Sequence, residues 1–241
     1  MSELQALALF LPMSLFSGFV RGLTGFGGPL ILIPAMAFFI SPVSATATAV
    51  VVDMWSNVTL LRQAIRNASR NTVILLALSS GLAIPMGGWV LLTADPEMVK
   101  RILYIAVGIA ALILLTGWRF PRPMKPVELL GGGALAGLVM GSTGLGIIIV
   151  PVLFSMPEAA ATSRANLVVW VFLMSVLLGS VLALGGGFGT TELIRGLALA
   201  PAYLLGTWLG QKAFGRIDEK AFRTIILVFL LIFSGVGLVF G

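Results

Sequence analysis

The chain of 241 residues contains no cysteine and no histidine, and only 10% of its residues are charged. Without cysteine it can form neither a disulfide nor a thiolate metal site, and without histidine it lacks the usual nitrogen ligands for zinc or iron. Any proton coupling must therefore use a carboxylate. Walker motifs, Gly-x-Ser-x-Gly elbows and metal-ligand spacings are also missing from the sequence. We therefore expect no enzyme, no cofactor and no metal site.

The scarcity of charge indicates a membrane protein. A soluble domain carries about 25% charged residues, whereas long stretches of this chain contain no Asp, Glu, Lys or Arg. These stretches cover residues 22–52, 71–94, 102–118, 129–157, 165–191, 196–211 and 224–241. Most of them reach the roughly 17–25 residues that a tilted helix needs to cross the bilayer. The sequence therefore predicts an all-α integral membrane protein, in which the net charge of +6 reflects cytoplasmic loops and not nucleic-acid binding.

Breaks in hydropathy divide the chain into ten apolar segments, so we expect about 8–10 membrane segments. The segments lie near residues 4–20, 25–40, 44–61, 71–93, 99–118, 127–141, 144–156, 161–185, 190–213 and 221–240. Two of them, 25–40 and 144–156, are short for spanning helices and are interrupted by glycine and proline. Short segments of this kind at corresponding positions of two halves are typical of the binding site of a secondary transporter.

The two halves of the chain repeat one another. A Gly-x-Thr-Gly-x-Gly turn before an apolar run occurs twice, in "GLTGFGGPLILIP" at residues 22–34 and in "GSTGLGIIIVP" at residues 141–151. Farther along, "GGW" at residues 87–89 matches "GTW" at residues 206–208. Because these matches follow the same order in both halves, they indicate a duplication.

The duplication divides the chain into a first membrane repeat, residues 1–118, and a second, residues 127–241, joined by a cytoplasmic linker at residues 119–126. Three arginines between residues 62 and 70 and the basic linker place both loops on the cytoplasmic side. With five segments in each half, the repeats are predicted to be inverted, with both termini outside.

Both glycine turns are irregular chain, which hydrocarbon tolerates only where it is buried in protein or lines a cavity. Glycine permits positive φ, a threonine hydroxyl can cap the following helix, and a helix N-terminus suits a small anion. Inverted turns would meet near the midplane and form one anion site. Alternatively, the glycines only let helices pack closely. The turn residues predicted to bind the anion are Thr24, Gly25, Gly27, Ser142, Thr143, Gly144 and Gly146.

The paired turns, each followed by a stretch of small Ala, Thr and Ser residues, resemble the TauE/SafE family of membrane transporters. The resemblance runs from about residue 14 to the end of the chain. It implies a multi-pass carrier of the bacterial inner membrane, built of two homologous halves. Members of the family are associated with the export of sulfite or of organosulfonates such as sulfoacetate.

Three of the ionisable residues in or beside the apolar segments are candidates for a functional role. Asp53, within "VVVDMWSNV", is predicted to couple protons, to form a structural ion pair, with Arg164 as one candidate partner, or to lie at the membrane interface. Arg21 is predicted either to contact the anion or to reach the cytoplasmic interface. Arg164 is predicted either to contact the anion or to pair with Glu158. Asn57 shares the face of Asp53 and is a candidate hydrogen-bond partner of the substrate.

The sequence thus predicts a secondary transporter that exports a small sulfur-containing or organic anion, such as sulfite or an organosulfonate, by alternating access at a midplane site. Efflux needs no coupling ion, because an interior-negative potential drives an anion outward by about 2.3 kcal/mol per charge per 100 mV. Uptake would need one, and Asp53 would then carry the proton. An anion channel or a non-transporting membrane assembly subunit is the alternative. The expected partners are the anionic substrate and the lipid bilayer but no nucleic acid, and a homodimer remains open.

Overall fold

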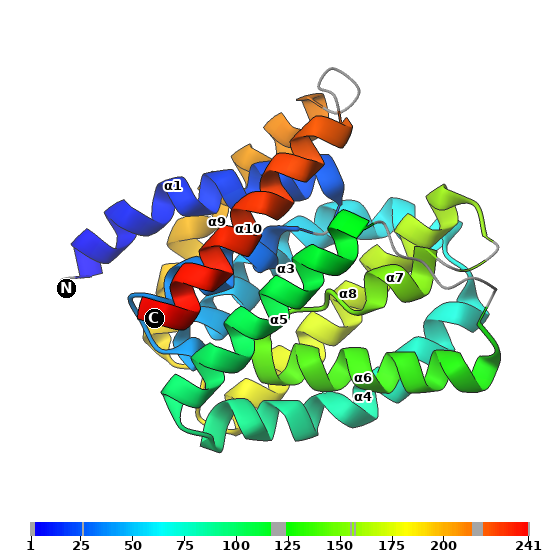
Figure 1. Ribbon diagram of the computed structural model, residues 1–241, viewed down its shortest axis with the longest axis horizontal. Coiled ribbons are helices and arrows are strands. Elements are labelled where there is room, and N and C mark those ends of the chain that lie inside the picture. Colours follow the sequence, from blue (N-terminus) through cyan, green and yellow to red (C-terminus); the bar gives the residue numbers. More distant parts are fainter. Residues whose placement is uncertain are drawn as a thin grey trace.

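The computed structural model describes residues 3–25, 27–116, 124–154, 156, 158–213 and 219–240, and over these residues the chain forms ten helices and no strand (Figure 1). The helices are α1 (Glu3–Thr24), α2 (Gly28–Ala37), α3 (Pro42–Asn67), α4 (Arg70–Thr93), α5 (Pro96–Thr116), α6 (Pro126–Thr143), α7 (Ile149–Phe154), α8 (Ala160–Leu184), α9 (Thr190–Ala213) and α10 (Glu219–Phe240). Each apolar segment predicted from hydropathy corresponds to one helix. The all-α prediction is confirmed.

Five of the helices, α1, α4, α5, α8 and α9, are long and apolar enough to cross a membrane. Shorter apolar helical stretches, 28–37 and 226–239, are found in α2 and α10. Length and composition therefore support five complete crossings among the described residues, fewer than the 8–10 segments expected. Large apolar side chains cover the outside of these helices, among them Leu82 at 80% and Leu184 at 91% exposure, as contact with lipid requires.

Local sequence explains where the helices that build the interior begin. The side chain of Ser41 accepts a hydrogen bond from the backbone N–H of Ser44 at 3.2 Å, and Pro42 follows in the first turn of α3. A serine cap satisfies a free N–H, and proline has none to leave unsatisfied. Helix α2 likewise has a proline, Pro29, in its first turn. Both helices therefore start at fixed residues, which positions their side chains in the bundle.

The two halves pack by exchanging partners. The most extensive helix pairs are α4 with α6 and α1 with α9, so the first helix of each half lies along the fourth helix of the other. Figure 1 shows these two pairs along opposite edges of the bundle. Helix α5 packs on α10, and α3 contacts both α8 and α9, while α8 also contacts α4. This exchange of equivalent helices is what a duplicated sequence would produce.

Glycines bring the backbones of the exchanged helices close together. A Cβ added to Gly22 of α1 would lie 2.2 Å from the carbonyl oxygen of Thr207 in α9. A Cβ added to Gly141 of α6 would lie 2.5 Å from the carbonyl oxygen of Ile84 in α4. Neither approach leaves room for a side chain, so these glycines do serve helix packing, as small residues often do in membranes.

The contacts also correct one part of the sequence match between the halves. Gly87 of α4 faces the carbonyl oxygen of Leu138, and Gly210 of α9 faces that of Phe19, each 2.2 Å from an added Cβ. Phe19 lies three residues before Gly22, and Leu138 lies three residues before Gly141, the first glycines of the two turn motifs. The counterpart of Gly87 is therefore Gly210 and not Gly206, one helical turn away from the position that the "GGW" and "GTW" matches indicated.

Candidate functional site

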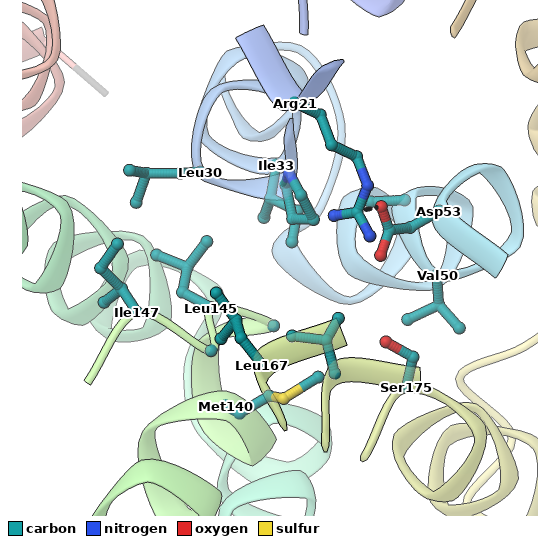
Figure 2. A pocket seen from close by; sticks show the side chains of 15 residues that line it. Arg21, Leu30, Ile33, Val50, Asp53, Met140, Leu145, Ile147, Leu167 and Ser175 are labelled. Atoms are coloured by element: carbon teal, nitrogen blue, oxygen red, sulfur yellow. Dashed lines mark ion pairs between the residues drawn. The ribbon is translucent and has the colours of Figure 1, made fainter. Parts of the chain in front are cut away.

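A cavity of about 40 Å³ lies between α1, α2, α3, α6 and α8 and the segment 144–147 that follows α6. Its side-chain lining is apolar except for Arg21, Asp53 and Ser175. Figure 2 shows Arg21 and Asp53 on one side of the cavity, facing Leu145 and Leu167. Because about 10–15 Å³ of such space accommodates one water molecule, the cavity has room for about three groups of that size. The cavity therefore has space for one small group beside the ion pair.

The charged side of the cavity is an ion pair between α1 and α3. Nη1 of Arg21 lies 2.9 Å from Oδ1 of Asp53, and the two side chains are only 1% and 3% exposed. Nε of Arg21 donates to Oγ of Ser56 at 3.2 Å, and Nη2 donates to Oδ1 of Asn57. The guanidinium is thus held on three sides by α3.

Asp53 has two further hydrogen-bond donors. Its Oδ1 accepts from the hydroxyl of Tyr203 in α9 at 2.9 Å, and its Oδ2 accepts from Nδ2 of Asn57 at 2.8 Å. A Cβ added to Gly28, the first residue of α2, would lie 1.9 Å from the hydroxyl oxygen of Tyr203, so a larger residue here would displace that hydroxyl. The network therefore joins both halves of the chain around one buried carboxylate.

This network decides between several of the alternatives left by the sequence. Asp53 pairs with Arg21, so the ion-pair interpretation of Asp53 holds with a partner from α1 and not with Arg164. Arg21 is 2% exposed, which is incompatible with a side chain that extends to a membrane interface. Glu158 accepts hydrogen bonds from Thr72 at 2.9 Å and from Asn166 at 2.6 Å. Proton coupling by Asp53 stays a prediction.

Each glycine turn contains a glycine in the left-handed region. The φ angle is +86° at Gly25 and +75° at Gly144, values that favour glycine. A Cβ on Gly25 would lie 3.0 Å from Nε of Arg164, and one on Gly144 would lie 2.6 Å from Cδ1 of Ile33. Each turn thus contacts the other half of the chain: the first turn lies against α8, and the second lies against α2.

The threonines of the turns act differently from the prediction. The hydroxyl of Thr24 donates at 2.8 Å to the carbonyl four residues earlier and accepts from the N–H of Gly27 at 3.1 Å. The hydroxyl of Thr143 donates at 2.6 Å to the carbonyl four residues earlier and accepts from the N–H of Leu145 at 3.2 Å. Both hydroxyls therefore close the end of the preceding helix and do not cap the helix that follows. They also occupy amides that we had expected to be open to an anion.

The cavity brings together only part of the predicted site. Arg21, Asp53, Gly144 and Gly146 line it. Asn57 lies directly behind, hydrogen-bonded to both members of the ion pair. The predicted residues that are not among its lining are Thr24, Gly25, Gly27, Ser142, Thr143 and Arg164.

Comparison with known proteins gives one match. The family model described as sulfite exporter TauE/SafE matches residues 10–238. The chain belongs to the TauE/SafE family. No curated protein and no solved structure matches it significantly. This match confirms the resemblance seen in the paired turns. Because TauE/SafE proteins are membrane transporters and not enzymes, the chain is a multi-pass membrane transporter.

In this TauE/SafE protein the two halves differ at the cavity. Arg21 and Met140 hold corresponding positions, since the N–H of Gly25 donates to the carbonyl of Arg21 at 2.7 Å and that of Gly144 donates to the carbonyl of Met140 at 2.8 Å. Both side chains line the cavity. One half therefore presents a guanidinium where the other presents a thioether.

The partners of this pair differ in the same way. Ser80 of α4 is the counterpart of Tyr203, because the carbonyl of each faces a glycine of the exchanged helix, at 2.4 and 2.1 Å from an added Cβ. The indole N–H of Trp170 in α8 donates to the hydroxyl of Ser80 in α4 at 3.0 Å. This hydrogen bond joins α8 to α4 in the same way that the bond between Tyr203 and Asp53 joins α9 to α3. The second half of this TauE/SafE chain thus has an uncharged version of the network that the first half builds from charges.

Sequence reasoning missed Tyr203. It lies in the middle of an apolar segment, 150 positions from Asp53, and no motif surrounds it. A usable signal was its rarity, because the chain contains only two tyrosines. A buried tyrosine hydroxyl needs a hydrogen-bond partner, and a carboxylate in the membrane needs donors.

Proposed function

We propose that the chain exports a small sulfur-containing anion, such as sulfite or an organosulfonate, across the bacterial inner membrane, and that the cavity beside Arg21 holds this anion. The observation that carries the proposal is a buried guanidinium lining a small cavity, neutralised by a carboxylate of the same chain. Arginine binds planar and tetrahedral oxyanions through two parallel hydrogen bonds. The family supports a sulfite or sulfonate substrate.

In this proposal Asp53 is the counter-ion that the substrate replaces. In the structure the carboxylate pairs with Arg21. When an anion takes the guanidinium, two negative charges stand about 6 Å apart, and at an effective dielectric constant of about 20 their repulsion is about 3 kcal/mol. Uptake of a proton by Asp53 removes this repulsion. A monoanion and a proton then move together without net charge, so the membrane potential no longer drives the anion outward. In this coupled form the outward gradient of the solute itself must drive export, and an inward solute gradient or an acidic exterior would drive uptake.

The conformational part of the proposal is alternating access between two inverted repeats, residues 1–118 and 127–241, connected at 119–126. The exchanged packing of α1 with α9 and of α6 with α4 supports the duplication. The cavity has lining residues from both halves, which is where transporters of this architecture hold their substrates. Rocking of one half against the other would open the cavity to each side in turn.

Reconstitution into liposomes tests the function. We expect saturable counterflow: liposomes loaded with an unlabelled substrate accumulate labelled sulfite or sulfoacetate, and sulfate or simple carboxylates compete less. Lys100→Gln, which removes one charge of the partly exposed Lys100–Glu97 pair, serves as the control and should transport normally. Flux that rises without saturation and shows no counterflow would identify a channel. Absence of flux for all of these anions would contradict the proposal.

A further inference from the structure

We propose that Tyr203 is the positioning residue through which Asp53 binds and releases a proton inside the bundle. The inference rests on the proposed function, because it assumes that Asp53 is protonated when an anion takes Arg21. It adds a residue from the second half of the chain, which no motif identified. It also explains how the protonation of a first-half carboxylate reaches the other half.

The surroundings of Asp53 are saturated with donors. Arg21 and the hydroxyl of Tyr203 both contact Oδ1 at 2.9 Å, and Nδ2 of Asn57 contacts Oδ2 at 2.8 Å. Asp53 is 2% exposed and Tyr203 is fully buried, so in the structure these hydrogen bonds come from protein groups. This arrangement suits a carboxylate, which only accepts hydrogen bonds. A protonated carboxyl group in the same place must donate one.

Tyr203 is the neighbour that can change roles. A guanidinium has no acceptor, so Arg21 cannot receive a hydrogen bond from the protonated acid. The oxygens of Ser56 and Asn57 already accept from Arg21. A tyrosine hydroxyl both donates and accepts, and turning its O–H about the C–O bond converts one role into the other. Asp53 can therefore gain a proton without losing its hydrogen bond to α9.

The proton balance is simple. A proton from water in the open cavity is transferred to Oδ1 of Asp53, which then donates to the hydroxyl oxygen of Tyr203. The proton returns to water when the cavity opens on the other side. Tyr203 stays neutral throughout, and only an O–H bond of Asp53 forms and breaks. The guanidinium of Arg21, released from the carboxylate, is then available to the anion.

The other charged groups on α8 and α9, the helices packed most extensively against α3, contact residues other than Asp53. Nζ of Lys212, at the end of α9, lies 3.7 Å from the ring centroid of Trp208. On α9, Glu192 accepts from Ser44 at 2.5 Å, and Arg195 donates to the same hydroxyl at 3.3 Å, near the start of α3. On α8, Arg164 lies against Gly25 in the first turn. The titratable groups facing Asp53 among the described residues are thus Arg21 from α1 and Tyr203 from α9.

The second half of the chain shows how the equivalent helices are joined where no proton-binding carboxylate is present. At the corresponding place, Trp170 and Ser80 form a neutral hydrogen bond at 3.0 Å, and no carboxylate is present between them. A hydrogen bond between uncharged side chains therefore joins the equivalent helices of the second half, without a tyrosine or a charge. A tyrosine paired with a carboxylate in one half only is a specialisation of that half.

The test compares Tyr203→Phe with Tyr104→Phe in liposomes. Tyr104 is the matched control, because it is also fully buried and its hydroxyl donates to the carbonyl of Pro34 at 3.3 Å, away from Asp53. We expect Tyr203→Phe to lose at least tenfold in transport driven by a pH gradient and to lose clearly less than that in anion counterflow, which needs no net release of the proton. The midpoint of its pH profile should move by about one unit or more, the effect of one hydrogen bond to a charged group. Tyr104→Phe should change neither property.

A second variant displaces the hydroxyl without removing it. In Gly28→Ala the new methyl would lie 1.9 Å from the hydroxyl oxygen of Tyr203 and push it away from Asp53, so the same loss of pH-driven transport is expected. Wild-type coupling in both variants, or an equal effect of Tyr104→Phe, would overturn the role of Tyr203. Counterflow by the wild type with no response to pH would overturn proton uptake by Asp53. Absence of counterflow in the wild type would instead overturn the proposed function.

Discussion

Replacing Arg21 with methionine, the residue that holds the corresponding position in the second half, isolates the contribution of charge. The variant leaves Asp53 as a buried carboxylate without its cation. The ion pair spans 2.9 Å between side chains that are 1% and 3% exposed. With the charges about 4 Å apart and an effective dielectric constant of about 20, their attraction is about 4 kcal/mol. This agrees with the roughly 3–5 kcal/mol lost when one partner of a buried pair is removed.

Two donors reduce this loss without abolishing it. Tyr203 and Asn57 still bond to Asp53, so we expect the free energy of unfolding of Arg21→Met to fall by about 3 kcal/mol, near the lower end of that range. The double variant Arg21→Met/Asp53→Asn removes both charges. Because replacing a whole buried pair by neutral residues is often close to neutral, it should lie within about 1 kcal/mol of the wild type.

The assay is thermal unfolding of purified protein in lipid nanodiscs, combined with anion counterflow. We expect the melting temperature of Arg21→Met to fall by roughly 10 °C and the deficit to shrink as the pH falls, since protonated Asp53 carries no charge. The double variant should recover stability, and neither variant should transport. A double variant as unstable as the single one would refute the electrostatic reasoning. A double variant with normal counterflow would place the substrate elsewhere.

The remaining predictions concern other residues at the cavity. Gly144→Ala should lose about 2 kcal/mol of stability and most counterflow, because φ is +75° and the new Cβ would lie 2.6 Å from Ile33, whereas Gly131→Ala, with nothing within 4 Å, should melt at or above the wild-type temperature. Asp53→Asn should exchange anions independently of pH and show a larger anion-induced rise in melting temperature than the wild type; an unchanged pH profile would make Asp53 purely structural. Trp170→Phe should lose about 1 kcal/mol through the bond to Ser80, about as much again through the smaller ring at a fully buried position, and keep the wild-type pH profile; an altered profile would contradict the neutrality of that half.

Much of the fold could be predicted because the bilayer restricts the sequence so strongly. Stretches without charged residues indicate the helices, and all ten apolar segments correspond to helices of the structure. The register between the halves was harder to obtain. The tryptophan motifs suggested that Gly87 corresponds to Gly206, whereas the contacts with Leu138 and Phe19 select Gly210. A short motif aligns two segments by residue type, whereas equivalent helix positions are those whose backbones make the same contacts. Here the two criteria differ by four residues, which is one helical turn.

The candidate site was only partly predictable for a related reason. Arg21 and Asp53 were both recognised as costly charges in an apolar setting, but their pairing is a long-range contact between different helices. From the sequence, the partner named for Asp53 was Arg164 and not Arg21. The role of Thr24 depended on geometry that a motif does not contain, because a threonine hydroxyl can bond to either side of a turn. Tyr203 needed the packing of α9 on α3 to be known.

Protection of a single cysteine in the cavity tests the central claim most directly. The chain has no cysteine, so Ser175→Cys, at a lining position that is 4% exposed, would carry the only thiol, and Ser180→Cys on the outer face of α8 is the control. We expect methanesulfonate to slow the alkylation of Cys at position 175 by N-ethylmaleimide, with no effect at position 180. The protection should disappear in the Arg21→Met/Asp53→Asn background. Equal labelling with and without the sulfonate, in a preparation that shows saturable sulfonate counterflow, would contradict an anion site beside Arg21.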